Sequence, residues 1–383
     1  MLVLRGADVV DANGIREADV AVEGGQIVSV GDVPAADEEI DVSGKFVAPG
    51  LIDAHVHMMM DGRPDVISVV SENETMLAYR AAANLRSALE SGVTAVRDLG
   101  APTSLAIDAR DAVDEGIIDG PRVVACGENV VMTGGHGHWF GREADGRAEV
   151  KKAVREQLKR GADVIKCMAT GGVLTEGAIT GAPELDEGEL TTLVEAASAK
   201  RVPTAAHAHG ADGIKNAVRA GISSVEHGTF MDREAAELMA ERGTYWVPTV
   251  KASHGILTEG VEAGIPEYVV EKGEEAADSM ADAFEYALDA GVKIAMGTDA
   301  GTPFNFHADI PEELELMVEY GLTPEDALEA ATVNAADLLG FSDVGSIEEG
   351  YRADIVVLDA DPREDVTAWQ SPTHVVSHGN IVR

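Results

Sequence analysis

The chain has 383 residues, of which 45% are hydrophobic, and it carries 68 acidic against 29 basic residues, for a net charge of −39. Long-range repulsion at this charge disfavours nucleic acid and anionic membrane surfaces as partners. No stretch of the chain reaches the roughly 18 consecutive apolar residues that a membrane span requires. The N-terminus does not resemble a secretory signal, so we expect a cytoplasmic protein.

Both ends of the chain have the pattern of short antiparallel strands. Alternating apolar residues and Gly-rich turns predict strands within residues 2–11, 18–31, 38–50, 353–362 and 373–383. Neither end has enough apolar residues for a core of its own. We therefore expect residues 1–50 and 345–383 to form one small composite β-sandwich domain.

Residues 51–344 alternate between strand-like and helix-like segments, which is typical of a parallel sheet. Eight apolar segments predict strands within residues 47–57, 92–100, 121–127, 162–170, 202–210, 222–228, 244–250 and 292–299. Amphipathic segments such as 76–92 and 148–161 predict helices between them. Thr323, Pro324 and Asp326 predict the start of a helix over 323–340 that leads back to the β domain. The expected fold class is α/β, a (β/α)8 TIM barrel with a small β-sandwich.

The acidic residues are spread over helix-like segments such as 271–290 and 311–320, and only ten of the basic residues are lysine. Concentrated salt shortens the Debye length to a few ångströms and screens repulsion among such charges. The composition therefore indicates a halophile. Cys126 and Cys167 lie within predicted strands and give no disulfide framework, which agrees with a reducing cytoplasm. The composition leaves a homo-oligomer open.

Residues that can bind metals occur where the predicted strands end. His55 and His57 end the first strand with one residue between them, so both side chains project to the same side. The other predicted strands contribute Lys166, His207, His209, His227 and Asp299. A single buried histidine is more often structural, but five strands with ligand-type residues indicate a metal site at the mouth of the barrel.

Lys166 lies in an apolar strand, where a lone buried ammonium is costly. Burial lowers the pKa of the amine and makes it nucleophilic, so that it can take up carbon dioxide and form a carbamate. A carbamate can bridge two divalent metals. The alternative is an ordinary ion pair between Lys166 and a carboxylate such as Asp299, but the surrounding ligand-type residues favour the carbamate.

These motifs resemble the amidohydrolase superfamily, in the branch of Xaa-Pro dipeptidase-like (prolidase-like) and imidazolonepropionase-related proteins. The resemblance covers nearly the whole chain and rests on APGLIDAHVH, GVTAVRDLG, GADVIKCMATGG, HAHG, SVEHG, GTDAG, AATVNAADLLG and GSIEEGYRADIVVLD, in this order. It implies a hydrolase with two divalent metals, usually zinc. By this resemblance His55 and His57 hold the buried metal, His207 and His227 hold the more exposed one, carboxylated Lys166 bridges the two, and Asp299 binds the first metal beside a bridging hydroxide.

The implied chemistry is hydrolysis of an amide. Imidazole and carboxylate ligands suit zinc, and two such ions lower the pKa of a shared water that attacks the carbonyl carbon. Asp299 is expected to pass the proton to the departing amine. We expect His209, which shares the strand parity of His207, and His136, which follows a Gly-rich turn, to face the mouth as catalytic donors to the carbonyl oxygen.

Substrate contacts are expected from the loop after the third strand and from cations near the mouth. In that loop His136 and His138 are candidates, although the loop could instead pack over the strand. Tyr245, Arg142 and Lys251 are candidates for a substrate carboxylate, although exposed Arg and Lys are by default solvated. We assign structural roles to His254, His307, His374, His378 and the run Met58 to Met60.

The leading hypothesis is a binuclear enzyme that cleaves a small-molecule substrate, either a dipeptide (Xaa-Pro-like) or an N-acyl amino acid. The alternative is a mononuclear cyclic-amide hydrolase or deaminase of the imidazolonepropionase type, which resembles this chain in HxH but lacks a bridging lysine. A non-catalytic barrel scaffold is a third hypothesis. It is weakened because no expected ligand position is empty.

Overall fold

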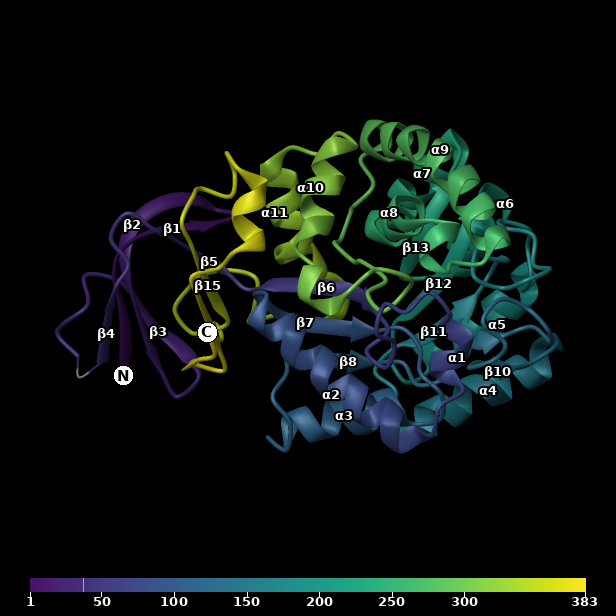
Figure 1. The fold of residues 1–383 in the computed structure, drawn as a ribbon, viewed down its shortest axis with the longest axis horizontal. Coiled ribbons are helices and arrows are strands. Elements are labelled where there is room, and N and C mark those ends of the chain that lie inside the picture. The colour runs from purple at the N-terminus through teal and green to yellow at the C-terminus, as the bar shows by residue number, and fades with distance from the viewer. Residues whose placement is uncertain (37) are drawn as a thin grey trace.

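The computed structural model describes residues 1–36 and 38–383. Figure 1 shows a β-rich part built from both ends of the chain beside a larger part in which helices surround parallel strands. The two parts meet where β5 (Phe46–Pro49) is followed by β6 (Leu51–Val56).

Strands from both chain ends pair into one eight-stranded sheet. Its order is β17-β16-β15-β5-β1-β2-β3, and β4 also pairs with β1. The ends meet where β5 pairs antiparallel with β15, from Phe46↔Leu358 to Pro49↔Ile355. The remaining strands are β1 (Leu2–Asp11), β2 (Gly14–Glu23), β3 (Gln26–Gly31), β4 (Glu38–Asp41), β15 (Ile355–Leu358), β16 (His374–Ser377) and β17 (Asn380–Ile381).

This terminal sheet has a hydrophobic core to which both ends contribute. Val9 and Val20 from the first strands pack in the same cluster as Ile355 and Val376 from the last ones. The apolar alternation that predicted strands at both ends therefore also predicted a shared core. Backbone pairing joins all eight strands into a single sheet. The two separate layers of the predicted β-sandwich are therefore not distinguished by the strand pairing.

The central part contains parallel strands in two groups, β6-β7-β8 and β10-β9-β11-β12-β13-β14. Most of their residues are buried, as expected for parallel strands that are covered by helices. The short β9 and β10 lie in the stretch predicted as a loop. The strands are β7 (Val93–Asp98), β8 (Arg122–Ala125), β9 (Val130–Val131), β10 (Arg142–Glu143), β11 (Ile165–Met168), β12 (Thr204–Gly210), β13 (Ser224–Phe230) and β14 (Tyr245–Val247).

The segment predicted as the eighth strand, 292–299, differs from the others because it forms isolated bridges in place of a continuous ladder. Ile294 bridges Trp246 of β14, and Ala300 bridges Val56 of β6, both in parallel orientation. The close approach requires a glycine, since a Cβ atom on Gly297 would lie 2.4 Å from Val247 Cγ1. The segment therefore lies between β14 and β6.

Twelve α-helices and three short 3₁₀ helices are found in the described residues. They are α1 (Val66–Val70), α2 (Glu74–Glu90), α3 (Leu105–Asp114), α4 (Gly146–Arg160), α5 (Glu187–Ser198), α6 (Ala211–Ala220), α7 (Arg233–Arg242), α8 (Val250–Glu259), η1 (Val261–Ala263), α9 (Glu267–Ala290), η2 (His307–Asp309), α10 (Glu312–Glu319), α11 (Pro324–Ala331), α12 (Val333–Leu339) and η3 (Val366–Gln370). Apolar residues repeat on one face of each long helix and bury that face against the strands.

The helix predicted over 323–340 begins as expected but does not run to its end. Thr323 and Asp326 form a complete capping box at the start of α11, with Pro324 at its first position. Thr332, at φ −126° and ψ −88°, interrupts the helix, and its hydroxyl donates to Leu328 O at 2.6 Å. The prediction of one continuous helix is therefore wrong, and the chain forms α11 and α12.

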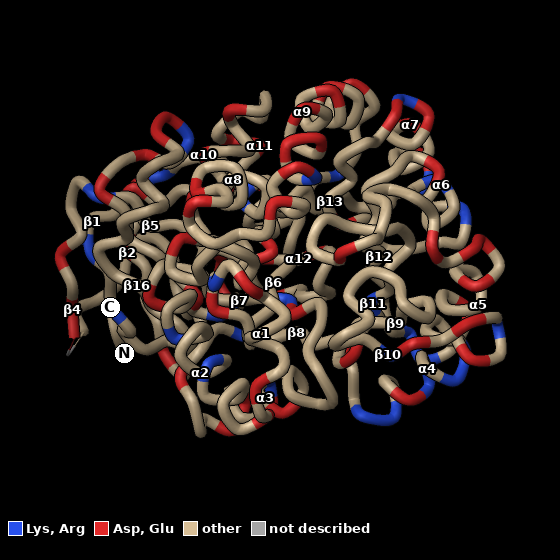
Figure 2. The backbone as a smooth tube through the Cα atoms, turned by 45° about the vertical axis from the view of Figure 1, so that its right-hand side comes forward, with Lys and Arg blue, Asp and Glu red and all other residues tan. Residues whose placement is uncertain are grey.

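The acidic residues are spread along the outer helices and loops, as Figure 2 shows. No helix in the described part of the chain has the length and apolar content that a membrane crossing requires. Both cysteines, Cys126 and Cys167, are buried free thiols.

Candidate active site

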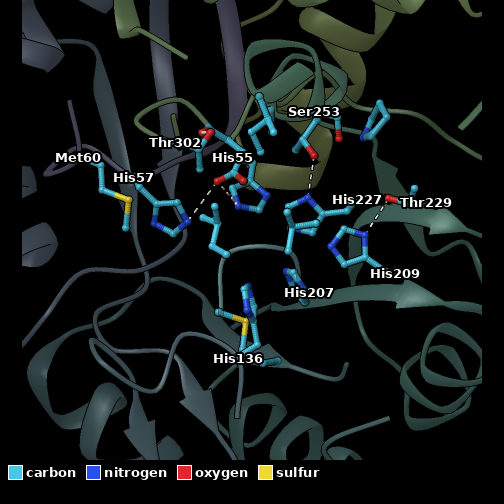
Figure 3. A pocket seen from close by; sticks show the side chains of 18 of the residues that line it. His55, His57, Met60, His136, His207, His209, His227, Thr229, Ser253 and Thr302 are labelled. Atoms are coloured by element: carbon cyan, nitrogen blue, oxygen red, sulfur yellow. Dashed lines mark hydrogen bonds and ion pairs between the residues drawn. The ribbon is translucent and has the colours of Figure 1, made fainter. Parts of the chain in front are cut away.

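The predicted ligands come together in one buried pocket at the ends of the parallel strands. β6 places His55 in the pocket and His57 directly after its end, β11 contributes Lys166, and the following strands bring the other histidines (Figure 3). Two sets of three side chains each have their ligand atoms within 4.8 Å of one another. They are His55 with His57 and Asp299, and His207 with His209 and His227.

In the first set, hydrogen bonds fix which nitrogen of each imidazole faces the pocket. His57 Nδ1 lies 2.8 Å from the carbonyl oxygen of Gly100, which can only accept, so this nitrogen donates. His55 Nδ1 lies 2.9 Å from a carboxylate oxygen of Glu226, which likewise accepts. Both neutral rings therefore present the lone pair of Nε2 to the pocket.

These lone pairs face a further acceptor. Asp299 Oδ1 lies 3.5 Å from Nε2 of His55 and 3.3 Å from Nε2 of His57. It is buried and has no hydrogen-bond partner in the described residues. Three buried acceptor atoms that converge repel one another unless a cation lies among them, and one proton cannot satisfy all three. The first set therefore fits a divalent cation.

Backbone strain accompanies two of these residues. Asp299 has a φ of +60° and His227 a φ of +70°, values that residues other than glycine rarely adopt. Such conformations cost about 1–3 kcal/mol and cluster at functional sites. At Asp299, the backbone N–H donates to His55 O at 2.7 Å, which ties the carboxylate to the end of β6.

The second set has neutral hydroxyl partners. His209 Nδ1 lies 2.8 Å from Thr229 Oγ1, and His227 Nδ1 lies 2.7 Å from Thr249 Oγ1. A hydroxyl can donate or accept, so these contacts orient the rings and permit either tautomer. His207 Nε2 is buried without a hydrogen-bond partner in the described residues. The second set therefore also offers nitrogen ligands to a cation.

Lys166 lies beside both sets of ligands and is 1% exposed. Burial lowers the pKa of its amine, an effect that the nearby carboxylates only partly oppose. Among the residues that the structure describes, Lys166 forms no ion pair within 4.0 Å, so the pairing with Asp299 that the sequence left open is not found here. Burial therefore favours the neutral amine over the ammonium at this position.

His136 is brought to the second set by the loop after β9. Its ring centroid lies 4.4 Å from that of His207, and its Nδ1 lies 2.9 Å from Thr175 Oγ1. Burial lowers the pKa of both His136 and His209 to about 3, so both are neutral at pH 7. Gly172 makes room for them, because a Cβ atom there would lie 2.6 Å from His136 Nε2 and 2.7 Å from His207 Nε2.

Sequence reasoning missed a buried ion pair behind the first set. Glu226 and Arg97 are 0% and 1% exposed, and their carboxylate and guanidinium are 3.0 Å apart. Glu226 immediately precedes His227, and alternation would send the two side chains to opposite faces. The positive φ of His227 breaks this alternation. The signal that could have found the pair is two charged residues, Arg97 and Glu226, within otherwise apolar strands.

Four predicted substrate contacts lie outside the pocket. Tyr245 begins β14, at the strand end opposite the mouth, and its hydroxyl donates to Asp337. Arg142 Nε donates to Glu156 at 2.9 Å. His138 is exposed, and its Nδ1 lies 3.0 Å from Gly135 O. Lys251 donates a hydrogen bond to Glu312. Their positions do not support contact with a substrate.

Apolar side chains form the outer walls of the pocket, whose volume is about 710 Å³ with its open mouth included. Trp139 and Phe140 come from the loop after β9, and Val173 and Leu174 from the loop after β11. α8 and α9 add Ile256 and Met280. The pocket thus combines a polar floor at the strand ends with apolar walls, as small-molecule sites commonly do.

Comparison with known proteins agrees with this geometry. The amidohydrolase family pattern matches residues 46–382. Ochratoxinase from Aspergillus niger is 34% identical over 370 residues, which cover 88% of this chain and 75% of that protein.

Two solved structures have the same fold over 99% of this chain. A Xaa-Pro dipeptidase with methionine bound in its active site has a TM-score of 0.93 and 33% identity, with 99% of that chain covered. A prolidase in complex with N-methylphosphonate-L-proline has a TM-score of 0.92 and 32% identity, with 98% of that chain covered. The predicted family and the predicted enzyme class, a hydrolase of C–N bonds, are confirmed. This chain belongs to the amidohydrolase family.

Proposed function

We propose that the protein is a binuclear metal-dependent amidohydrolase that cleaves the amide bond of a dipeptide or an N-acyl amino acid. The observation that carries the proposal is the pair of three-residue ligand sets, one around Asp299 and one around His207, with buried Lys166 beside both. A single metal would leave one of these sets of candidate ligands without a cation.

The donor set suits zinc. In this proposal His55, His57 and Asp299 would hold one ion and His207 and His227 the other. Lys166, as a carbamate, would supply oxygen ligands to both. The low-pKa amine of Lys166 supports this, because only a neutral amine can add carbon dioxide. Two divalent cations would lower the pKa of a shared water and supply a hydroxide nucleophile near neutral pH.

The protein's own groups then manage the proton and the carbonyl oxygen. Asp299 belongs to the first ligand set, where its carboxylate can take a proton from the attacking water and release it to the departing amine. His136 and His209 each have a hydroxyl at Nδ1 that permits a proton on Nε2. Such an N–H can donate to the negative charge that develops on the carbonyl oxygen.

The substrate class follows from the relatives. Two solved structures that align with 99% of this chain are a Xaa-Pro dipeptidase and a prolidase. Their names supply the dipeptide, and their bound ligands are an amino acid, methionine, and an N-substituted proline, N-methylphosphonate-L-proline. An N-acyl amino acid presents the same amide and differs only in its acyl part.

The surroundings of the site complete the proposal. We place the ligands at the mouth of a closed (β/α)8 barrel, residues 51–344, beside a domain made of residues 1–50 and 345–383. The isolated bridges of segment 294–300 to β14 and β6 support closure. The charge of −39 supports a halophile's cytoplasm as the working environment.

The test is a screen of dipeptides and N-acyl amino acids against zinc-loaded protein in high salt, combined with metal analysis. We expect hydrolysis and close to two metal ions per chain. One ion per chain with deamination or cyclic-amide hydrolysis would favour the mononuclear alternative. Undiminished hydrolysis by Asp299→Ala would dismiss the role given to this carboxylate.

A further inference from the structure

We infer that the pocket selects substrates with an apolar, preferably aromatic, side chain and rejects charged ones, with Trp139 as the specificity-determining residue. This inference rests on the proposed function and deepens it, because it names the side chain next to the amide that is cleaved. The inference rests on the apolar side chains of the pocket walls and on the few wall groups that have no hydrogen-bond partner in the described residues.

The walls consist of apolar side chains from four elements. Val173, Ile256 and Met280 are each at most 9% exposed, so packing fixes their positions. Val173 and Ile256 pack in one cluster, which joins the loop after β11 to α8. These walls are therefore a preformed apolar surface that favours contact with an apolar substrate side chain.

Trp139 and Phe140 place an aromatic surface next to the first ligand set. The ring centroids of Trp139 and Phe140 are 4.7 Å apart, and that of Phe140 is 5.8 Å from His57 in an edge-on arrangement. Trp139 is half-buried and lines the pocket. A third ring could therefore pack against this pair while its amide lies over the ligands, and aromatic pairs stabilise such an arrangement beyond the burial of apolar area.

The pocket offers a charged side chain no partner. Among the lining residues that the structure describes, the only lysine is Lys166, the only acidic residue is Asp299, and there is no arginine. The proposed function assigns both residues to the metal centre. The chain has 68 acidic residues, yet none of the others that the structure describes lines this pocket. A bound arginine or glutamate side chain would be buried without a counter-charge, which is costly.

Most other polar groups in the walls are already engaged. Thr229 and Thr249 contact histidines, and the hydroxyl of Thr302 donates to Asp299 O at 2.8 Å. The indole N–H of Trp139 is buried without a partner in the described residues. A buried tryptophan N–H usually finds an acceptor, so this donor suits an oxygen of the substrate backbone.

The first experiment measures kcat/KM for a set of N-acetyl amino acids that differ only in the side chain: phenylalanine, leucine, methionine, arginine and glutamate. We expect the apolar members to exceed the charged ones by about 100-fold or more. Arginine or glutamate substrates that are cleaved as well as the phenylalanine substrate would overturn the inference.

A binding measurement separates this inference from the proposed function. Calorimetric titration of the zinc-loaded protein with free phenylalanine, methionine, arginine and glutamate reports selectivity without turnover. If no substrate is cleaved but phenylalanine and methionine bind at least 10-fold more tightly than arginine and glutamate, the proposed function fails and the inference stands. Equal binding of all four amino acids would overturn the inference even if amides are cleaved.

Variants of Trp139 test its part directly. Trp139→Ala should lower kcat/KM for the phenylalanine substrate about 10- to 100-fold and that for the glutamate substrate much less. Trp139→Phe keeps the apolar face and should restore most of the preference for phenylalanine over leucine. A Trp139→Ala variant with unchanged ratios among the apolar substrates would contradict the assignment.

Introducing a charge into the wall should reverse the preference. Ser253 on α8 lines the pocket and is only partly buried, so Ser253→Asp can be accommodated. This variant should raise kcat/KM for the arginine substrate at least 10-fold relative to phenylalanine, whereas the uncharged Ser253→Asn should not. His254→Asp adds the same charge at the next, exposed position outside the pocket and should leave both values unchanged. Equal effects of the two aspartate variants would contradict the inference.

Discussion

Glu226 fixes the orientation of His55, because its carboxylate oxygen lies 2.9 Å from His55 Nδ1 in a fully buried contact. The other oxygen of this carboxylate lies 3.0 Å from the guanidinium of Arg97, and this ion pair holds the carboxylate in place. An imidazole that donates Nδ1–H to a carboxylate presents a more basic Nε2 to a metal. The first ligand set is therefore oriented by a charged group, whereas Thr hydroxyls contact His209 and His227 in the second set.

Glu226→Gln should weaken metal binding at the first set by about 10- to 100-fold, the usual effect of removing such a partner. It should also lower stability, because Arg97 loses its buried counter-charge and broken buried pairs cost about 3–5 kcal/mol. Chelator competition measures the affinity, and thermal unfolding measures the stability. Thr249→Val removes the hydroxyl partner of His227 and serves as the comparison, with the stability loss expected to be smaller. Metal affinity unchanged in Glu226→Gln would refute this role.

Gly172→Ala should disturb the metal centre without unfolding the protein. The added Cβ atom would lie within 2.7 Å of the Nε2 atoms of His136 and His207, so both rings must shift. We expect weaker binding of the second metal ion in a zinc titration and at least a 10-fold loss of kcat, since misplacement of reacting groups is costly. Gly177→Ala lies in the same loop, at a strained φ of +78° but with open space around its Cβ position. If both variants bind zinc equally well, the steric explanation is wrong.

Salt should stabilise the folded protein. The net charge of −39 is distributed over the surface, and self-repulsion among these charges is screened by molar salt. We expect the midpoint of thermal unfolding, followed by circular dichroism, to rise between 0.1 and about 3 M KCl, by about 2–4 °C for each kcal/mol gained. Replacing the exposed Glu271, Glu274 and Glu275 of α9 by glutamine should reduce this rise. A midpoint that is the same at low and high salt would speak against adaptation to salt.

Glu313 should make stability depend on pH. Its buried carboxyl accepts N–H bonds from Val250 at 2.8 Å and Lys251 at 2.7 Å, yet burial dominates and raises its pKa from 4.5 to about 8. As pH rises, the unfolded chain loses this proton first. The stabilisation that Glu313 contributes is therefore complete below about pH 4.5 and is lost as pH approaches 8.

Urea unfolding at pH 5 and pH 8, at constant salt, checks this sign. The free energy of unfolding should fall more between these two pH values in the wild type than in Glu313→Gln, which cannot titrate. Other buried carboxyls, such as Asp98, whose pKa burial raises to about 7, contribute equally to both proteins and cancel in the comparison. Identical pH dependence in the two proteins would show that Glu313 is ionised throughout this range.

The sequence predicted most of the elements that carry the site. Alternation and apolar runs located the strands that bear His55, Lys166, His207 and His227, because strand periodicity depends on local pattern. The capping box at Thr323 was equally local and is present. The segment around Asp299 was predicted as a strand, but it makes only isolated bridges, since its pairing depends on how closely β14 and β6 approach it.

Long-range contacts were beyond prediction. Whether Glu226 faces the pocket side depends on the positive φ of His227, which no residue preference indicates. Tyr245 was predicted as a candidate contact for a substrate carboxylate, but it lies at the start of β14, at the strand end opposite the mouth. The apolar walls come from four separate elements, and only the folded chain brings Trp139 near the pocket that Met280 also lines.

The central claim is a pair of metal ions bridged by a carboxylated Lys166, and a crystal structure tests it most directly. Crystals should be grown from zinc-loaded protein with bicarbonate, and metal content should be measured on the same sample. The account predicts branched electron density beyond Nζ of Lys166, with one oxygen directed to each of two cations. Density that ends at Nζ as a plain ammonium, in a protein replete with metal, would contradict it.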